Sequence, residues 1–347
     1  MRFALVGCGD IGGLRGEAVA LADGTSLTTV CDSDARRADD FAARFGAAAA
    51  RDWREAVGRE DVDAVIVSTP PASHAEIAIG ALAAGKHVLC EKPLARTPEE
   101  CARMVEAARA GPAVLATGFN YRFYPSVVRA REILADGRIG DLSHVRGYAG
   151  YSATEHNQPW LRDAAVVGGG AMWDNGIHLI DLVDHFLGGV EATVGVGTSG
   201  VWGYGTEDNG FAIVRGPDGR TASLSASWTE WRGYRFGLDI YGARGCIRVR
   251  CFPMLTDVVW ASETGGKTRR RVHLFPKVHF MEHLKKYQWV VTRSFVDEIE
   301  AFGRKIRGEP SLVGTAEDGL RAVQVAHAAV HGDGWVSTGE SGAGGGS

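Results

Sequence analysis

Several common signals are missing from this 347-residue sequence, and each absence narrows the possible functions. The formal net charge is −4, so the chain lacks the concentrated positive field that nucleic acid or anionic lipid would require. No uninterrupted apolar stretch approaches the roughly 18 residues of a membrane span, and no signal-peptide pattern follows Met1. We therefore expect a cytoplasmic protein that has neither nucleic acid nor a membrane as its partner.

Cysteine is also sparse, and its spacing matches no common metal-binding or redox motif. The six cysteines include no CxxC pair, which excludes the usual zinc and redox motifs and indicates reduced thiols. The one basic run, Lys267 to Arg271, lies between two glycines and an apolar segment, so a solvated hairpin strand explains it better than a binding patch. The composition, 45% hydrophobic and 23% charged, is that of an ordinary soluble protein with room for two domains.

Apolar runs alternate with amphipathic stretches through the first part of the chain. The runs cover residues 3–6, 27–31, 62–67, 88–90 and 113–117. Strands that alternate with helices predict a parallel, doubly wound sheet. Two helix starts are expected from capping-box spacing, at Ser73 with Glu76 and at Thr97 with Glu100.

The later part of the chain is richer in strands. A helix is expected over 126–135 and another over about 169–187, with strands over 142–148, 192–196, 210–215, 221–228, 235–241, 246–250, 257–261 and 268–275. Short turns between these strands favour an antiparallel sheet. The apolar side chains of a long C-terminal helix recur every three or four residues and must pack on something, most simply the first domain: Tyr287, Val291, Phe295, Ile299, Phe302 and Ile306.

These patterns predict an α/β protein with three segments. Residues 1–120 form a dinucleotide-binding Rossmann domain with a doubly wound parallel sheet. Residues 121–335 form a second α/β domain for substrate binding and oligomerisation, with C-terminal helices that pack back on the first domain. Residues 336–347 form a flexible tail that is rich in glycine and serine.

The strongest local motif is Gly7-Cys8-Gly9-Asp10-Ile11-Gly12, which has an apolar strand before it and a helix after it. In a dinucleotide-binding turn the first glycine permits the tight turn, the second lets the backbone approach a pyrophosphate, and the third allows close packing of helix on strand. The helix N-terminus attracts the phosphates. The alternative is a glycine turn that binds no ligand.

Asp32 lies 20 residues beyond Gly12, at the end of the second strand, and favours the ligand-binding interpretation. A carboxylate at this place accepts hydrogen bonds from the adenosine ribose and repels an additional 2′-phosphate. NAD is therefore the preferred cofactor, while Arg36 and Arg37 nearby leave NADP possible.

The segment from Gly80 to Lys86 resembles the phosphate-binding P-loop motif, but His87 stands where the motif requires serine or threonine. The segment also ends a helix and leads into a strand, which is the reverse of the P-loop context. Gly85 is therefore expected to terminate the helix rather than to bind phosphate.

Thr69-Pro70-Pro71 and Glu91-Lys92-Pro93 follow two of the predicted strands, at the carboxyl edge where ligands bind in such sheets. An ammonium group near a nicotinamide can polarise a carbonyl or steady a developing alkoxide. Lys92 is thus a candidate catalytic residue. A surface lysine beside a carboxylate is the alternative.

Asp174 and His178 are four residues apart on a predicted helix, where the carboxylate can orient the imidazole. Gly168, Gly169 and Gly170 precede them and allow close approach of the backbone. His178 is then a candidate acid/base, and a helix-face histidine bonded to an aspartate is the alternative. Asp181 and His185 extend the same face, but nothing else signals zinc, so no metal is expected.

Over nearly its whole length the chain resembles the glucose-fructose oxidoreductase/inositol dehydrogenase/rhizopine-catabolism (Gfo/Idh/MocA) group. The motifs that carry the resemblance are Gly7-x-Gly9-x-x-Gly12, Asp32, Glu91-Lys92-Pro93, Asn120-Tyr121-Arg122-x-x-Pro125, Trp160, Gly168-Gly169-Gly170 and Asp174-x-x-x-His178-x-x-Asp181. The resemblance implies a Rossmann domain joined to an α/β domain with a large, mostly antiparallel, open-faced sheet. That open face commonly builds dimers or tetramers, which implies a homodimer or homotetramer.

The resemblance also implies roles for individual residues. Lys92 corresponds to the catalytic lysine, His178 to the usual acid/base, and Asp174 to the residue that tunes the histidine and touches substrate hydroxyls. The residues expected at the cofactor are Gly7, Gly9, Asp10, Ile11, Gly12, Asp32, Ser33, Arg37, Thr69, Pro70, His74, Glu91, Lys92, Asn120, Trp160 and Arg162. Those expected at the substrate, a sugar or cyclitol, are Lys92, Tyr121, Arg122, Asp174 and His178.

Three functions remain open. The first is an NAD(P)-dependent dehydrogenase or ketoreductase that acts on a sugar, cyclitol or related polyol. The second is a glycosidase that uses NAD for a transient oxidation, and the third is a non-catalytic sensor of a sugar or dinucleotide. The loop from Tyr151 to Arg162, which contains Glu155, His156 and Asn157, aligns with no substrate subgroup and does not decide between them.

Overall fold

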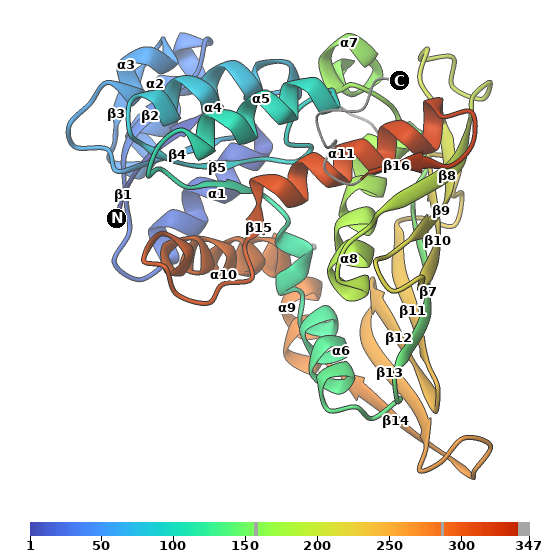
Figure 1. Ribbon diagram of the computed structural model, residues 1–347. Coiled ribbons are helices and arrows are strands. Elements are labelled where there is room, and N and C mark those ends of the chain that lie inside the picture. The colour runs from blue at the N-terminus through green and yellow to red at the C-terminus, as the bar shows by residue number, and fades with distance from the viewer. Residues whose placement is uncertain (156–158, 286–287, 339–347) are drawn as a thin grey trace. The chain divides into compact units, whose positions relative to one another are not determined.

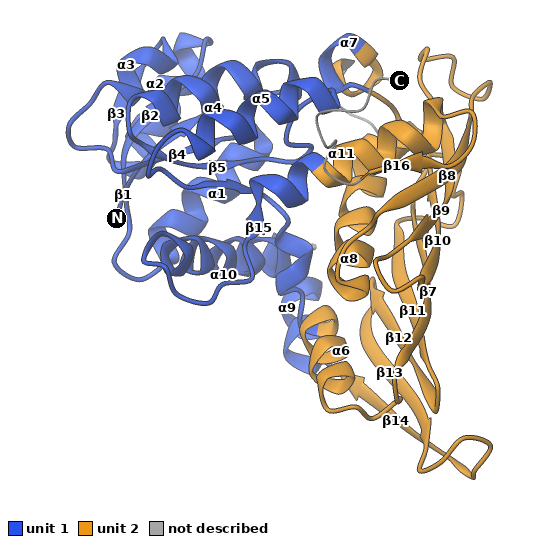
Figure 2. Cartoon of the chain, viewed as in Figure 1, with its two compact units in different colours: residues 1–125, 165–168, 275–320 blue, residues 126–164, 169–274, 321–347 orange. Residues whose placement is uncertain are grey.

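The computed structural model describes residues 1–155, 159–285 and 288–338, and the chain divides into two compact units (Figures 1 and 2). The first unit contains residues 1–125, 165–168 and 275–320. The second unit contains residues 126–164, 169–274 and 321–347. His156, Asn157, Tyr287 and the predicted tail beyond residue 338 lie outside the described residues.

The first unit is built on a seven-stranded sheet in the order β15-β6-β5-β4-β1-β2-β3. All neighbouring strands run parallel except β15, which pairs antiparallel with β6. The strands are β1 (Arg2–Val6), β2 (Ser26–Cys31), β3 (Ala48–Ala50), β4 (Ala64–Val67), β5 (His87–Cys90), β6 (Leu115–Thr117) and β15 (Gly314–Thr315).

Helices cover this sheet and carry most of its connections. They are α1 (Asp10–Leu21), α2 (Ala35–Phe45), α3 (Trp53–Val57), α4 (His74–Ala83), α5 (Pro98–Arg109), α9 (Pro276–Lys285) and α10 (Gln288–Ile306), with 3-10 turns η1 (Pro71–Ser73) and η2 (Asn120–Phe123). Along the chain, α7 (Ala164–Val167) and α11 (Ala316–His331) each cross a boundary between the units.

The core of the first unit joins α10 to the sheet and to α1. Phe295, Ile299 and Phe302 of α10 are buried in one hydrophobic cluster with Phe3 and Leu5 of β1. The apolar stripe predicted for this helix therefore forms part of the first unit's core, which explains why a segment so late in the chain belongs to this unit.

The second unit is built on a nine-stranded sheet in the order β14-β13-β12-β11-β7-β10-β9-β8-β16. All neighbours are antiparallel except β7 and β10, which are parallel. The strands are β7 (Leu142–Gly150), β8 (Ala192–Thr198), β9 (Asn209–Arg215), β10 (Thr221–Ser227), β11 (Arg235–Gly242), β12 (Gly245–Cys251), β13 (Met254–Ala261), β14 (Thr268–Leu274) and β16 (Val336–Ser337).

One helix lies closely against the sheet of the second unit. A β-carbon at Gly147 of β7 would lie 2.6 Å from a methyl carbon of Leu179, and one at Gly176 would lie 2.9 Å from Ala226 of β10. The helical elements of this unit are α6 (Pro125–Ala135), η3 (Ala153–Glu155), η4 (Pro159–Arg162), a π-helical turn η5 (Met172–Gly176) and α8 (Ile177–Leu187). Glycine on both sides of the contact thus fixes how near α8 and the sheet can come.

The predicted α/β class is confirmed, with a parallel Rossmann sheet and a second, mostly antiparallel sheet. The basic run also forms a strand, β14, that is largely exposed, as predicted. Three short strands were not predicted: β3 consists only of alanine, and β15 and β16 contain two residues each. Such segments carry too little apolar pattern to be recognised.

One predicted helix cap is correct and one is wrong. The Thr97 side chain accepts a hydrogen bond from the backbone N–H of Glu100, 3.3 Å away, at the start of α5. Ser73 instead donates to the Thr69 hydroxyl at 2.7 Å, because a 3-10 turn already places it in a helical conformation rather than the extended one that a cap needs.

None of the helices in residues 1–155, 159–285 and 288–338 has both the length and the apolar character needed to cross a membrane.

Candidate cofactor and acid–base sites

The glycine turn of the first unit has the shape that a dinucleotide requires. Gly7 has a φ of +102°, and a β-carbon there would lie 2.6 Å from the carbonyl carbon of Ser68. A β-carbon at Gly12 would lie 2.1 Å from the Gly7 oxygen. At Gly9, which precedes α1, the same position has no atom within 4 Å, so the N-terminus of α1 faces open space where a phosphate fits.

Asp32 is fixed just beyond the end of β2. Its two carboxylate oxygens accept hydrogen bonds from the backbone N–H groups of Cys8, at 2.8 Å, and Asp34, at 2.9 Å. The side chain is only partly buried, so each oxygen keeps acceptor capacity for a hydroxyl group. These residues fit the ribose of NAD, while the exposed Arg36 and Arg37 follow directly in α2.

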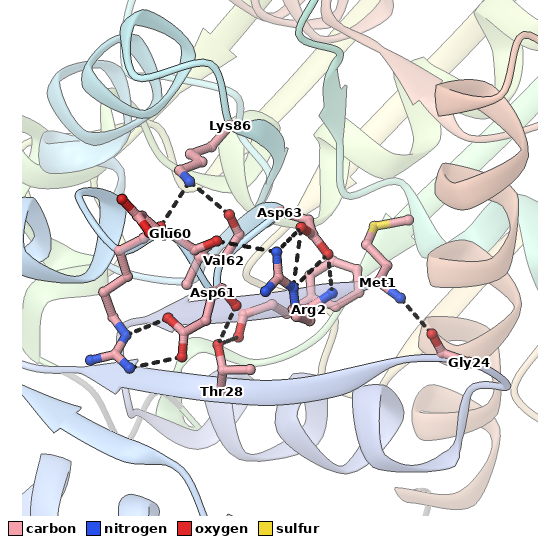
Figure 3. A network of polar contacts seen from close by, with 11 residues as sticks. Met1, Arg2, Gly24, Thr28, Glu60, Asp61, Val62, Asp63 and Lys86 are labelled. Atoms are coloured by element: carbon pink, nitrogen blue, oxygen red, sulfur yellow. Dashed lines mark hydrogen bonds and ion pairs between the residues drawn. The ribbon is translucent and has the colours of Figure 1, made fainter.

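The near P-loop segment has a structural role instead. Lys86 donates through its Nζ to the carbonyl oxygens of Arg59, at 2.8 Å, and Val62, at 2.7 Å (Figure 3). Gly85 has a φ of +74° and follows Ala84, the residue that caps the C-terminus of α4. The ammonium group therefore satisfies backbone carbonyls before β4, and the interpretation of Gly85 as a helix terminator is correct.

Lys92 lies two residues beyond the end of β5, in the segment Glu91-Lys92-Pro93. Its side chain is partly exposed, and its backbone N–H donates to Glu91 Oε2 at 3.2 Å. The buried imidazole of His74 has its ring nitrogens 3.0 Å from the Pro93 carbonyl oxygen and 2.8 Å from the Thr69 carbonyl oxygen. His74 thus bridges the segments that follow β4 and β5, and burial lowers the pKa of its imidazole.

Glu91 is held by a buried ionic network that was not predicted from the sequence. Arg15 of α1 is 0% exposed and donates to Glu91 Oε1 at 2.6 Å and to Glu298 Oε2 at 2.5 Å. The guanidinium carbon also lies 3.8 Å from the centre of the Phe295 ring. Burial raises the pKa of the Glu298 carboxyl to about 7 although Arg15 opposes this shift.

Two sequence signals point to this network. Arg15 lies in a helix whose other buried residues are small or apolar, and Glu298 occupies the apolar stripe of α10 between Phe295 and Ile299. A charged residue among buried apolar neighbours needs an opposite charge nearby. The sequence alone does not identify which opposite charge it meets.

The motif Asn120-Tyr121-Arg122 forms η2 and is buried in the first unit. Asn120 donates to the Ser294 hydroxyl at 2.9 Å, and Tyr121 stacks on Tyr124 with ring centres 4.3 Å apart. Arg122 pairs with Asp318 at 3.0 Å. The proposed contacts of these three residues with cofactor or substrate remain predictions.

In the second unit, Glu207 fixes the start of the helix that carries Asp174. The carboxylate accepts from the N–H groups of Gly170, at 2.8 Å, and Met172, at 2.9 Å. A β-carbon at Gly170 would lie 2.0 Å from the Glu207 carbonyl oxygen. Burial raises the pKa of Glu207, and the two backbone donors oppose this shift. Glu207 was also missed, because it lies 37 residues from Gly170 in a loop without a motif.

Asp174 is held by two aromatic residues of the second unit. Its Oδ2 accepts a short hydrogen bond from the Tyr151 hydroxyl and another from the Trp228 indole N–H at 3.1 Å. The predicted regular helix over 169–187 is wrong at its start, because Asp174 lies in the π-helical turn η5. His178 lies in α8, which begins after that turn, and its side chain is buried.

The remaining predicted residues lie in two places of the second unit. Asp181 of α8 is buried, and the nearby Asp184, which was not predicted, is also buried and pairs with Arg321 at 2.7 Å. Trp160 and Arg162 form part of η4, and the Arg162 guanidinium lies 5.1 Å from the centre of the Tyr204 ring. Within the described parts of the chain, no three histidine, cysteine or acidic side chains are grouped so that they could hold a metal ion.

Comparison with known proteins places the chain in one family. Residues 1–119 match the GFO/IDH/MocA oxidoreductase model with an NAD-binding Rossmann fold, and residues 127–248 match the GFO/IDH/MocA C-terminal domain. Myo-inositol 2-dehydrogenase of Thermotoga maritima is 28% identical over 95% of this chain and 95% of that protein. Inositol 2-dehydrogenase 2 of Saccharopolyspora erythraea is 33% identical over 71% of this chain and 72% of that protein.

A solved structure agrees with this placement. Levoglucosan dehydrogenase in complex with NADH and levoglucosan has a TM-score of 0.85 at 25% identity, with 97% of this chain and 98% of that chain covered. The predicted oxidoreductase class and NAD cofactor are thereby confirmed. The chain belongs to the GFO/IDH/MocA family of oxidoreductases, whose N-terminal domain is an NAD-binding Rossmann fold.

Proposed function

We propose that this protein is a dehydrogenase or ketoreductase that transfers a hydride between nicotinamide and a hydroxyl or keto carbon of a sugar, cyclitol or related polyol. The similar proteins are named for myo-inositol and levoglucosan, which are both rich in ring hydroxyls. The observation that carries the proposal is the Asp174 carboxylate, which Tyr151 and Trp228 hold in place four residues before His178.

The proposed cofactor residues come mainly from the glycine turn and from the segments that follow β2, β4 and β5 in the first unit, with Trp160 and Arg162 added from the second unit. They are Gly7, Gly9, Asp10, Ile11, Gly12, Asp32, Ser33, Arg37, Thr69, Pro70, His74, Glu91, Lys92, Asn120, Trp160 and Arg162. Ile11 supports this assignment because its side chain is exposed beside the turn. NAD supplies the hydride acceptor when it is bound, and Asp32 disfavours the 2′-phosphate of NADP without excluding it.

The proposed proton transfer uses Lys92, Asp174 and His178. His178 takes the proton from the substrate hydroxyl, and the Lys92 ammonium steadies the negative charge that develops on the same oxygen. Asp174 favours the protonated imidazole and accepts hydrogen bonds from neighbouring substrate hydroxyls. Tyr121 and Arg122 are proposed as further substrate residues.

A panel assay tests the activity. Cyclitols, aldoses, aminosugars and keto-sugars are each incubated with NAD or NADP and with the reduced cofactors, while nicotinamide absorbance is followed. We expect a net change with at least one ring polyol and a higher kcat/KM with NAD than with NADP. A glycosidase that oxidises transiently would cleave glycosides without accumulating reduced cofactor. A sensor would bind sugar without any turnover.

The exposed sheet face of the second unit supports self-association into a homodimer or homotetramer. Val196 of β8 and Phe211 and Ile213 of β9 lie on neighbouring strands and are each about half exposed. Large apolar side chains that adjoin one another on a surface are typical of an interface. Light scattering on the purified protein should give a mass of two or four chains, and Phe211→Asp should reduce it.

A further inference from the structure

Four aromatic side chains form a continuous cluster in the second unit, and one end of it is exposed. We call Trp202, Tyr204, Trp228 and Trp231 the aromatic cluster. Trp202 lies with its ring centre 5.6 Å from Trp231 and 6.3 Å from Tyr204, and Tyr204 lies 6.3 Å from Trp228. Trp228 is 1% exposed, whereas Trp231 is 66% exposed.

The exposed part of the cluster is held in a fixed position. Asp208 is 1% exposed, and its carboxylate accepts from the backbone N–H groups of Val201, at 2.7 Å, and Trp202, at 3.4 Å. The Trp202 indole N–H donates to the Trp228 backbone carbonyl oxygen at 3.1 Å. The Trp228 backbone N–H in turn donates to the Asp208 backbone carbonyl oxygen at 2.8 Å. A buried carboxylate that organises an exposed loop indicates a prearranged surface rather than incidental exposure.

The cluster is continuous with the proposed acid–base residues, because Trp228 donates through its indole N–H to Asp174 Oδ2. Polar groups also border it. The Arg162 guanidinium lies 5.1 Å from the centre of the Tyr204 ring, and Glu230 and Arg232, on either side of Trp231 in the sequence, pair at 2.8 Å. A surface of flat apolar rings bordered by charged hydrogen-bonding groups matches a pyranose, which has apolar C–H faces and a rim of hydroxyls.

We propose that the aromatic cluster binds a second sugar ring, so that the preferred substrate is a glycoside of at least two rings rather than a free monocyclic sugar or cyclitol. This inference rests on the proposed oxidoreductase function. The reacting ring lies at Asp174, and the ring joined to it by the glycosidic bond stacks on the cluster toward Trp231. Aromatic side chains supply large contact areas with little loss of conformational freedom, which suits a surface that binds a ring by its face.

The test compares one-ring and two-ring compounds in wild type, Trp231→Ala, Trp231→Phe and the control Trp335→Ala. Trp335 is also an exposed tryptophan of the second unit, at 54%. The probes are D-glucose with cellobiose and maltose, and D-galactose with lactose and melibiose. We expect at least one disaccharide to exceed its monosaccharide in kcat/KM by about tenfold, the scale of one aromatic stacking contact. Trp231→Ala should remove this advantage and leave monosaccharide turnover unchanged, while Trp231→Phe and Trp335→Ala retain it.

Calorimetric titration of the NADH-loaded protein with the same sugars separates this inference from the proposed function. If neither these sugars nor any compound of the panel assay is turned over, but a disaccharide binds about tenfold more weakly to Trp231→Ala than to wild type, the oxidoreductase proposal fails and the second-ring site stands. The inference is overturned if no disaccharide is preferred in turnover or binding, or if Trp231→Ala weakens one-ring and two-ring compounds equally. It is also overturned if Trp231→Ala lowers the oligomeric mass, since the cluster would then be a protein interface.

Discussion

The two units hold their proposed functional side chains by different physical means. In the first unit, Glu91 next to Lys92 is fixed by the buried guanidinium of Arg15, which also meets Glu298. In the second unit, Asp174 is fixed by neutral donors, the Tyr151 hydroxyl and the Trp228 indole. When one partner of a buried ion pair is lost, the other charge stays buried without compensation and the folded state is strongly destabilised. A neutral hydrogen-bond donor orients a carboxylate without neutralising its charge, and its loss costs less.

Because of this difference, we expect the ionic network to contribute mainly to stability and the aromatic donors mainly to turnover. The ionic network holds Glu91, the neighbour of Lys92 in the sequence, and joins α1, α10 and the segment after β5, so its loss should affect folding first. The aromatic donors orient the Asp174 carboxylate, which is the proposed partner of His178, so their loss should affect turnover first. Four variants or pairs of variants test this division, in order of decreasing effect.

Arg15→Met should give the largest loss of stability. It leaves Glu91 and Glu298 buried without their shared cation, and we expect the free energy of unfolding to fall by about 3–5 kcal/mol. Chemical denaturation provides the measurement. Arg44→Met is the matched control, because the Arg44–Glu17 pair is exposed and should contribute about 0–1 kcal/mol. Equal losses in the two variants would show that the buried network has no special role.

Lys92→Met and His178→Asn should each lower kcat/KM by at least about 10²-fold, the usual scale for a positioned acid/base. NAD affinity, measured by fluorescence titration, should fall far less than turnover in Lys92→Met and should stay unchanged in His178→Asn, because only Lys92 is among the proposed cofactor residues. Lys267→Met and His283→Asn replace exposed residues of the same types and should keep wild-type turnover. Wild-type turnover in Lys92→Met and His178→Asn would remove both residues from the mechanism.

Glu298→Gln should change how stability depends on pH. In the folded protein the Glu298 pKa is raised from 4.5 to about 7, so the folded state binds its proton more tightly than the unfolded chain does. The resulting stability is complete below pH 4.5 and is lost as pH rises toward about 7, a change on the order of 3 kcal/mol. Glutamine cannot titrate, so denaturation curves of the variant should lack this decline. The same decline in wild type and variant would assign it to other groups.

Tyr151→Phe and Trp228→Phe should have the smallest effects on stability but a clear effect on turnover. Each removes one hydrogen bond to Asp174, and we expect kcat/KM to fall by about tenfold with a loss of only about 1–2 kcal/mol in unfolding free energy. Tyr234→Phe is the control, because that hydroxyl donates to Asn175 Oδ1 at 3.4 Å. A loss of stability as large as that of Arg15→Met would erase the contrast between the units.

Local patterns in the sequence predicted most of the fold and part of the site. The glycine turn and Asp32 could be recognised because their chemistry depends on residues that are close in the chain and on one strand–turn–helix unit. The short strand β3 was not predicted, because its three alanines have a low preference for β-strands.

Contacts between distant residues were not predictable in the same way. Arg15 and Glu298 are 283 residues apart, and Trp228 and Asp174 are 54 residues apart, so only the folded chain shows which partners meet. The π-helical turn at Asp174 was missed because the spacing of Asp174 and His178 also fits a regular α-helix. Glu207, which caps that turn, lies in a loop whose sequence has no recognisable motif.

Among the glycines of the nucleotide turn, Gly9 alone has both an ordinary backbone conformation, with φ at −83°, and free room for a methyl group. Alanine at this position would therefore leave the apoprotein intact while occupying volume needed by the diphosphate. The added methyl group would thus block binding of the coenzyme without disturbing folding of the chain. Gly9→Ala would therefore provide a native-like apoenzyme in which sugar binding can be studied without redox turnover.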